Sequence, residues 1–333
     1  MRPVSRSIRA LAGALLLAAA TVFLSTCGGI GGSEFSGGGT GGTGISTAAI
    51  SGFGSVVMNG VHYRTDNNVA PGFKTKKVLN GKDNSGRADS DVFAVGMIVT
   101  VRHGVADNNA LEIEYRDNLQ GPVAKLIPGT DNVLEILGQS VVVGNAAIFA
   151  SLKQNDVVEV SGYADNAGRI RASRIFSLPP PLPPPAQEFE LKGFVSGSSL
   201  TGFRLGPLPD GSGTTVMVSY PAGGPANGTY AQILTTDWEP VGGVITATRV
   251  VKLAARTEFP EGTPVDLEGL VTTPWNGSVN DLSFAVEGKR VRWEAGTEFG
   301  GGTGDDLRQT NLRVQVHGME TGGVLSASRI VFR

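Results

Sequence analysis

The sequence predicts an all-β protein made of tandem small five-stranded, OB-like barrels. Three observations predict this fold class. Glycine is abundant, at 48 of 333 residues, with 18 prolines and 17% charged residues, a composition that suits many short strands and turns. Apolar residues alternate with period two far more often than with helical spacing. Three similar ten-residue stretches each form the last strand-like segment before a break in the pattern: RIRASRIFSL at 169–178, VITATRVVKL at 244–253 and VLSASRIVFR at 324–333.

The amino-terminal segment predicts export and a lipid anchor. Residues 1–26 carry three arginines and no acid, with an apolar run of 15 residues at Ala10–Leu24. This run is shorter than the roughly 20 residues that span a membrane, so a signal peptide is predicted. Cys27, the single cysteine, follows in LSTCGG, which resembles a bacterial lipobox except at Thr26, where Gly, Ala or Ser is usual. We expect Cys27 to be lipidated, and ordinary secretion is the alternative.

Two spacers flank or divide the folded part. Residues 27–44 are glycine-rich and predict a flexible tether. Residues 179–188 contain a proline run, which predicts a stiff, extended linker. Because this linker divides the mature chain into halves, we expect one pair of folded units on each side of it.

Two repeated markers divide the remaining sequence into four β units. An alanine in each closing stretch recurs at intervals of 62, 75 and 80 residues, at Ala110, Ala172, Ala247 and Ala327. The leucine of an L-x-G motif recurs at intervals of 72 and 76 residues, at Leu119, Leu191 and Leu267. The predicted units are unit 1 at 45–117, unit 2 at 118–178, unit 3 at 189–255 and unit 4 at 256–333.

Unit 2 has the clearest internal pattern. Five strand-like segments fit into about 60 residues, with a long connection between the third and the fourth. This arrangement favours an OB-like open barrel, and a β-sandwich is the alternative, although sandwiches usually need more strands. In the closing segment, Arg174 and Ile175 break the inside–outside alternation, which indicates a bulge nearby.

Several motifs carry a family resemblance. GFGSVVMNGVHYRT, VGMIVTVRHG, DNLQGPV, LGQSVVV and VVEVSGYADNAGRIRASRI resemble a bacterial domain-of-unknown-function family whose OB-like repeats occur in exported lipoproteins. The resemblance covers roughly residues 45–178, extends to 260–333 and is weak in unit 3. It implies a fold and a location, and it implies no activity because none is established for the family.

Catalytic motifs are missing from the sequence. It contains no G-x-S-x-G elbow, no P-loop and no zinc-binding pattern. His103 and His317 hold equivalent places before a glycine, and Ser161 holds that place in unit 2, which indicates a strand end that tolerates polar residues. We therefore predict a protein that is not an enzyme and has no metal site and no cofactor.

Trp275, Lys289 and Trp293 are the candidate ligand-binding residues. The segment GKRVRW is the predicted third strand of unit 4, with Lys289 and Trp293 on one face. OB-like barrels bind sugars or bases near this strand, where tryptophan stacks on a ring and lysine binds a polar group. The alternative interpretation places Trp293 in the core and the cations on the solvated face.

Charge narrows the choice of partners. Without residues 1–26 the chain has 25 basic and 30 acidic residues, a formal charge of −5. This balance argues against nucleic-acid binding, which needs a cationic surface. We expect a protein lipid-anchored to the cell envelope, at the outer membrane where the host has one, with its β units serving as non-catalytic protein-interaction or scaffolding modules. Glycan binding, to peptidoglycan or a surface polysaccharide, is the alternative.

Overall fold

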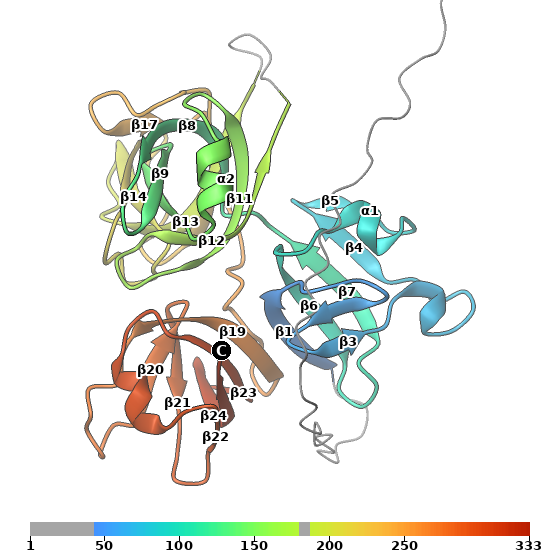
Figure 1. Cartoon of the computed structure of the whole chain (residues 1–333). Helices are drawn as coiled ribbons and strands as arrows, with labels where there is room; N and C mark the ends of the chain where they lie inside the picture. Colours follow the sequence, from blue (N-terminus) through green and yellow to red (C-terminus); the bar gives the residue numbers. More distant parts are fainter. Residues whose placement is uncertain (1–42, 180–186) are drawn as a thin grey trace, which may run out of the picture. The chain divides into compact units, whose positions relative to one another are not determined.

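The computed structural model describes residues 43–179 and 187–333 (Figure 1). The predicted signal peptide, Cys27, most of the tether and most of the proline run lie outside these residues. The described chain is all-β, which confirms the predicted fold class. Among its helices, none has the length and apolarity needed to cross a membrane.

Unit 2 is a closed five-stranded barrel of the predicted kind. Its strands follow the ring order β8-β9-β10-β12-β11, and β11 pairs back with β8. The third and fifth strands, β10 and β12, run parallel, and the short helix α2 lies between the third and fourth strands in the chain. The elements are β8 (Leu119–Ile127), β9 (Asn132–Ile136), β10 (Gln139–Val143), α2 (Ala146–Ser151), β11 (Val157–Ala164) and β12 (Ile170–Ser177).

Unit 4 repeats this ring. Its order is β19-β20-β21-β24-β23, closed by pairing of β23 with β19, and β21 and β24 are parallel. The third-to-fourth connection here contributes one more strand, β22, and the helix η2. The elements are β19 (Pro264–Thr273), β20 (Ser283–Val286), β21 (Lys289–Arg292), β22 (Glu298–Gly300), η2 (Gly304–Arg308), β23 (Arg313–Thr321) and β24 (Val324–Phe332).

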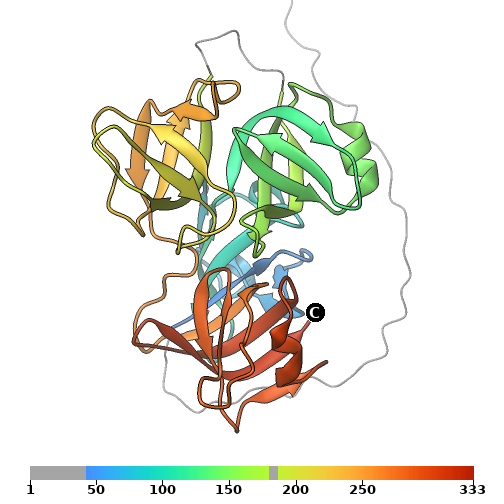
Figure 2. The same ribbon diagram turned by 90° about the vertical axis from the view of Figure 1, so that its left-hand side faces the viewer.

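Unit 3 follows the same order with its closing strand split in two (yellow to orange in Figure 2). The first part, β17, pairs with β15, and the second part, β18, pairs with β16. The elements are β13 (Phe189–Ser196), β14 (Gly202–Gly206), β15 (Val216–Ser219), β16 (Tyr230–Thr235), β17 (Val244–Thr246) and β18 (Arg249–Lys252).

Unit 1 is the most open of the four. Its hairpin of β2 and β3 forms a separate two-stranded sheet, which meets the rest of the unit through single bridges such as Arg64 to Asn109. The elements are β1 (Thr43–Ala49), β2 (Val56–Met58), β3 (Val61–Tyr63), η1 (Asp66–Asn68), β4 (Lys76–Leu79), β5 (Lys82–Asp83), α1 (Asp89–Val92), β6 (Ile98–Gly104) and β7 (Ala110–Tyr115).

The recurring alanines mark a bulge in the closing strands of units 1, 2 and 4, and in unit 3 Ala247 lies where the closing strand is split. In unit 2, Gly162 pairs with Ala172 and Ser161 with Arg174, so Ser173 is the extra residue. Unit 4 repeats this geometry with Ser328 as the extra residue. The bulge inverts the alternation, so that Ile175 turns back towards the core, as the sequence pattern indicated. The similar ten-residue stretches are therefore the closing strands of their units, and those of units 2 and 4 bend at the bulge.

The L-x-G glycines lie where the first strand passes close to the second. A Cβ on Gly193 would approach the carbonyl oxygen of Gly206 to 2.6 Å, and one on Gly121 would approach Leu137 Cγ to 2.8 Å. A side chain has no room at either point, so glycine is required there by close packing rather than by backbone conformation. The preceding leucines of the motif are fully buried in the barrel cores.

The units associate in an order that differs from our expectation. We expected units 1 and 2 to form one pair and units 3 and 4 the other. Instead, the first strands β1 and β19 pair in parallel and join units 1 and 4. The first strands β8 and β13 pair antiparallel and join units 2 and 3, whose apolar side chains form one continuous core. The reason is that in β8, β13 and β19 one edge is taken by the barrel's own fourth strand, while the second strand pairs only with the later part of the other edge and leaves its beginning to another barrel.

Candidate functional site

Of the three predicted ligand-binding residues of unit 4, Trp275 is buried, and Lys289 and Trp293 are partly buried. Trp275 is 7% exposed, and its indole Nε1 donates to the backbone oxygens of Ser278 (3.1 Å) and Asp281 (2.9 Å). Trp293 packs edge-on against Trp275, with 5.4 Å between ring centroids. Lys289 Nζ lies 2.6 Å from Glu320 Oε1 in a mostly buried ion pair. The two tryptophans meet as core side chains and do not form an exposed stacking platform, so glycan binding there stays a prediction.

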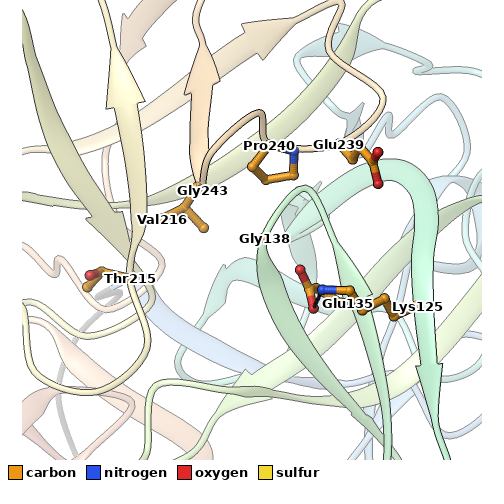
Figure 3. Close-up of a pocket in the computed structure, with 8 residues that line it drawn as sticks. All are labelled: Lys125, Glu135, Gly138, Thr215, Val216, Glu239, Pro240 and Gly243. Atoms are coloured by element: carbon orange, nitrogen blue, oxygen red, sulfur yellow. Dashed lines mark hydrogen bonds and ion pairs between the residues drawn. The ribbon is translucent and has the colours of Figure 1, made fainter.

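A cavity of about 270 Å³ lies between units 2 and 3 (Figure 3). Its one lysine, Lys125, is already paired with Glu135 at 2.9 Å, and this pair is solvent-exposed. The lining has no aromatic ring on which a sugar could stack. It also brings no nucleophile next to a base, so the cavity alone does not indicate a chemistry. The lining residues are Lys125, Glu135, Gly138, Thr215, Val216, Glu239, Pro240 and Gly243.

A buried ion cluster joins units 1, 2 and 3. Lys192 forms ion pairs with Asp117 and with Glu190, the latter at 2.6 Å, and its side chain is 3% exposed. Burial lowers the pKa of Lys192, but the two carboxylates outweigh it and hold that pKa above its ordinary value. Burial raises the pKa of Asp117 to about 8, although Lys192 opposes the rise. Asn80 of unit 1 donates to Asp117 at 3.0 Å and to Glu159 of unit 2 at 3.3 Å. The cluster fixes the junction.

A second polar cluster lies where units 1 and 4 meet. Tyr63 donates from its hydroxyl to Ser46 Oγ at 2.7 Å, and Ser46 Oγ lies 3.0 Å from His103 Nε2. Burial lowers the pKa of His103. In the neutral ring, a proton on Nδ1 would be donated to Gly104 O at 3.0 Å, which leaves Nε2 to accept from Ser46. His317 Nδ1 lies 3.8 Å from Asp266 Oδ2. Ser46 is 2% exposed, and a nucleophile needs access to its substrate, so the Ser–His contact is structural.

A third cluster ties unit 2 to units 1 and 4, and its contact with unit 1 is the backbone N–H of Ala49, which donates to the Tyr163 hydroxyl at 3.0 Å. Tyr163 donates from its hydroxyl to Glu268 Oε1 at 2.5 Å, and Arg313 Nε donates to the same oxygen at 2.8 Å. Glu287 accepts from the backbone N–H of Ala164 (3.0 Å) and of Leu270 (3.2 Å). Burial raises the pKa of Glu287 to about 7. These carboxylates hold the barrels together and are too enclosed to act on a substrate. In residues 43–179 and 187–333, no group of three potential ligands has metal-site geometry.

The closing strands differ in whether a further strand of the same unit pairs with the outer edge of their second half. After the bulge, β24 pairs in parallel with β22, and β7 pairs in parallel with β4. In unit 2 the first half of β12 pairs with β10, but beyond Ser173 no described strand pairs with its outer edge. The outer edge of β18 in unit 3 is likewise free of described strands. The two free edges, at 174–177 and 249–252, form the candidate functional site, because exposed edges pair readily with other chains.

The free edge of β12 carries an exposed apolar and cationic surface. Phe176 is 46% exposed, and the Arg174 guanidinium carbon lies 5.5 Å from its ring centroid. Leu178 N–H donates to Val157 O of β11, so alternate residues of β12 point their backbone groups inward. Ile175 and Ser177 therefore direct their N–H and C=O groups to the open side.

Two barrels match one known family. Residues 120–175 and 268–331 match the model described as Domain of unknown function (DUF5666). The DUF5666 matches run from the first strand to the closing strand of units 2 and 4, the two barrels whose rings are closed. This supports the domain-of-unknown-function resemblance for these two segments. No curated protein matches the chain.

The sequence interpretation missed the charged residues of the junctions, although a signal was present. Glu190 and Lys192 flank one L-x-G leucine, and Asp266 and Glu268 flank another. Because neighbours in a strand point away from the buried leucine, their side chains lie outside the barrel. Pairing of first strands buries these side chains between barrels.

Proposed function

We propose that the chain is a lipid-anchored cell-envelope protein whose barrels are non-catalytic protein-interaction modules. The observation that carries this proposal is the contrast between covered and free closing strands. Units 1 and 4 complete this edge with strands of their own, while units 2 and 3 present it without a described partner strand. A segment of another protein that adds a strand would gain main-chain hydrogen bonds for affinity and side-chain contacts for specificity.

The sequence supports the location. The leader at residues 1–26 and the lipobox-like LSTCGG would place lipid on Cys27, and the glycine-rich residues after it would act as a tether. A protein anchored in this way meets its partners at a membrane surface. The junction clusters support a scaffolding role, because buried ion pairs and shared first strands would hold the free edges in fixed positions.

The test is retention on cell-envelope fragments. Full chain carrying Cys27→Ser, tagged at its carboxyl end, is added to fragments that are either intact or digested with protease and washed. The substitution removes the lipid, so retention then reports on the barrels. We expect retention on intact fragments and its loss after digestion.

The other outcomes contradict the proposal. Retention that survives digestion would favour the glycan-binding alternative, and Trp275→Ala and Trp293→Ala would then be compared with the parent chain. Absence of retention on intact fragments would reject both forms of binding.

A further inference from the structure

The covering strands in units 1 and 4 follow one charge rule. At the first paired position after the bulge, Lys76 of β4 lies beside Glu112 of β7, and their side chains form an ion pair of 2.9 Å. At the corresponding position of unit 4, Glu298 of β22 lies beside Arg329 of β24. In both units, the covering strand runs parallel to the closing strand and begins with a charge opposite to its neighbour. The chain itself thus shows what kind of strand this edge accepts.

In unit 2 the corresponding closing-strand residue is Arg174. It forms no ion pair with any residue of the described chain, and its Nε is buried without a hydrogen-bond acceptor. The turn at Val95 and Gly96 of unit 1 lies against the start of this edge, where Arg174 Nη1 donates to Val95 O at 3.3 Å and Ser173 Oγ donates to Gly96 O at 2.6 Å. A guanidinium that is short of acceptors, beside an unpaired strand edge, leaves a place for a carboxylate.

The backbone beside Arg174 is also short of partners. The outward-pointing groups of Ile175 and Ser177 make no hydrogen bond with any residue in the described ranges. Phe176 lies between them, half-exposed, on the same face as Arg174 because alternate residues of a strand share a face. An added parallel strand would therefore place residue i beside Arg174 and residue i+2 beside Phe176.

We propose that the free edge of β12 binds an extended segment of a partner protein as a parallel strand, with an acidic residue beside Arg174 and an apolar residue two positions later against Phe176. This inference rests on the proposed function and names the partner's chemistry. The acidic side chain would lie beside Arg174 in the register that Glu298 has with Arg329, and would supply the acceptor that Arg174 lacks. The backbone groups of Ile175 and Ser177 would complete the ladder.

The test uses two labelled peptides and the full chain in detergent. The first peptide is Ser-Val-Glu-Ile-Leu-Thr-Ser, which has the acid and the apolar residue in the required spacing, and the second has Lys in place of Glu. Binding is followed by fluorescence anisotropy. We expect the Glu peptide to bind and Arg174→Glu to weaken it by about tenfold, the typical effect of one charge-assisted hydrogen bond. The same substitution should strengthen binding of the Lys peptide. Amide exchange at Ile175 and Ser177 should slow when the Glu peptide is bound.

Matched controls separate this edge from the rest of the surface. Phe176→Asp should weaken binding of the Glu peptide. Leu200→Asp, which also replaces an exposed apolar side chain by aspartate but at an 87% exposed loop residue of unit 3, should not. Arg249→Glu tests the free edge of β18 in the same way.

Three results would overturn the assignment: no binding of the Glu peptide, equal binding of both peptides, or a loss of binding with Arg249→Glu alone. If one of them occurs while retention on envelope fragments is still lost on protease digestion, the proposed function stands and strand addition at β12 is wrong. If retention survives digestion, the proposed function itself fails.

Discussion

Replacing Lys192 by methionine should destabilise the protein far more than breaking an exposed ion pair. The ammonium of Lys192 is almost fully buried and contacts two carboxylates, Asp117 and Glu190, which are themselves mostly buried. Methionine fills a similar volume but leaves at least one buried carboxylate without a counter-charge. Removing one partner of a buried pair costs about 3–5 kcal/mol. The free energy of unfolding should fall by that amount at pH 7.

The measurement is urea unfolding followed by tryptophan fluorescence, with Lys125→Met as the matched control. Lys125 is paired with Glu135 at the surface, so its loss should cost less than about 1 kcal/mol. Adding Glu190→Gln to Lys192→Met should recover part of the loss, because it removes an uncompensated charge. The reasoning is refuted if Lys192→Met and Lys125→Met have the same effect, or if the double variant is no more stable than Lys192→Met.

Three further predictions concern pH, the bulge and the core. The pKa of Glu287 is raised from 4.5 to about 7. Its contribution to the free energy of unfolding, about 3 kcal/mol, is therefore complete below pH 4.5 and is lost as the pH rises to about 7. Glu287→Gln should flatten that part of the curve of stability against pH, measured by thermal unfolding. Gly318→Ala should lower the free energy of unfolding by more than about 1 kcal/mol in urea titrations, because its Cβ would collide with the carbonyl oxygen of Ser326 across the bulge. Gly296→Ala, at a turn where the added Cβ would meet no atom within 4 Å, should cost less. Trp275→Ala should cost about 3–5 kcal/mol by the same assay, and an effect below 1 kcal/mol would contradict its place in the core.

Fold features that depend on local sequence could be predicted. The alanines and the L-x-G motifs recur along the sequence because each occupies a position where the packing inside one barrel restricts the residue type. Ala172 precedes the bulge, and Gly193 lies where two strands nearly touch. Such demands recur in every copy of the barrel and therefore appear in the sequence as a repeat.

Features that depend on association between barrels could not be predicted. The pairing of units 1 and 4 rests on three positions of β1 against β19, and no periodicity reports which of two similar first strands will meet. Glu268 of β19 and Lys192 of β13 are buried where their barrels meet other barrels, so a pattern considered one strand at a time assigns both side chains to solvent. The place of Trp275 in a loop does not separate the two interpretations, since an indole there suits a binding surface and a core equally well.

The first-strand pairings give the chain a nested order, with units 2 and 3 enclosed between units 1 and 4. The two ends of the inner pair lie close together, since Arg116 Nη1 donates to the backbone oxygen of Ala254 at 2.8 Å. Units 2 and 3 thus have the character of a domain inserted into a two-barrel host, with entry and exit at neighbouring points. The two-barrel host remains incomplete during synthesis until unit 4 has been made, because Ile45 of β1 pairs with Val265 of β19. The inserted pair has no such delay and can form its joint core as soon as its own residues are available.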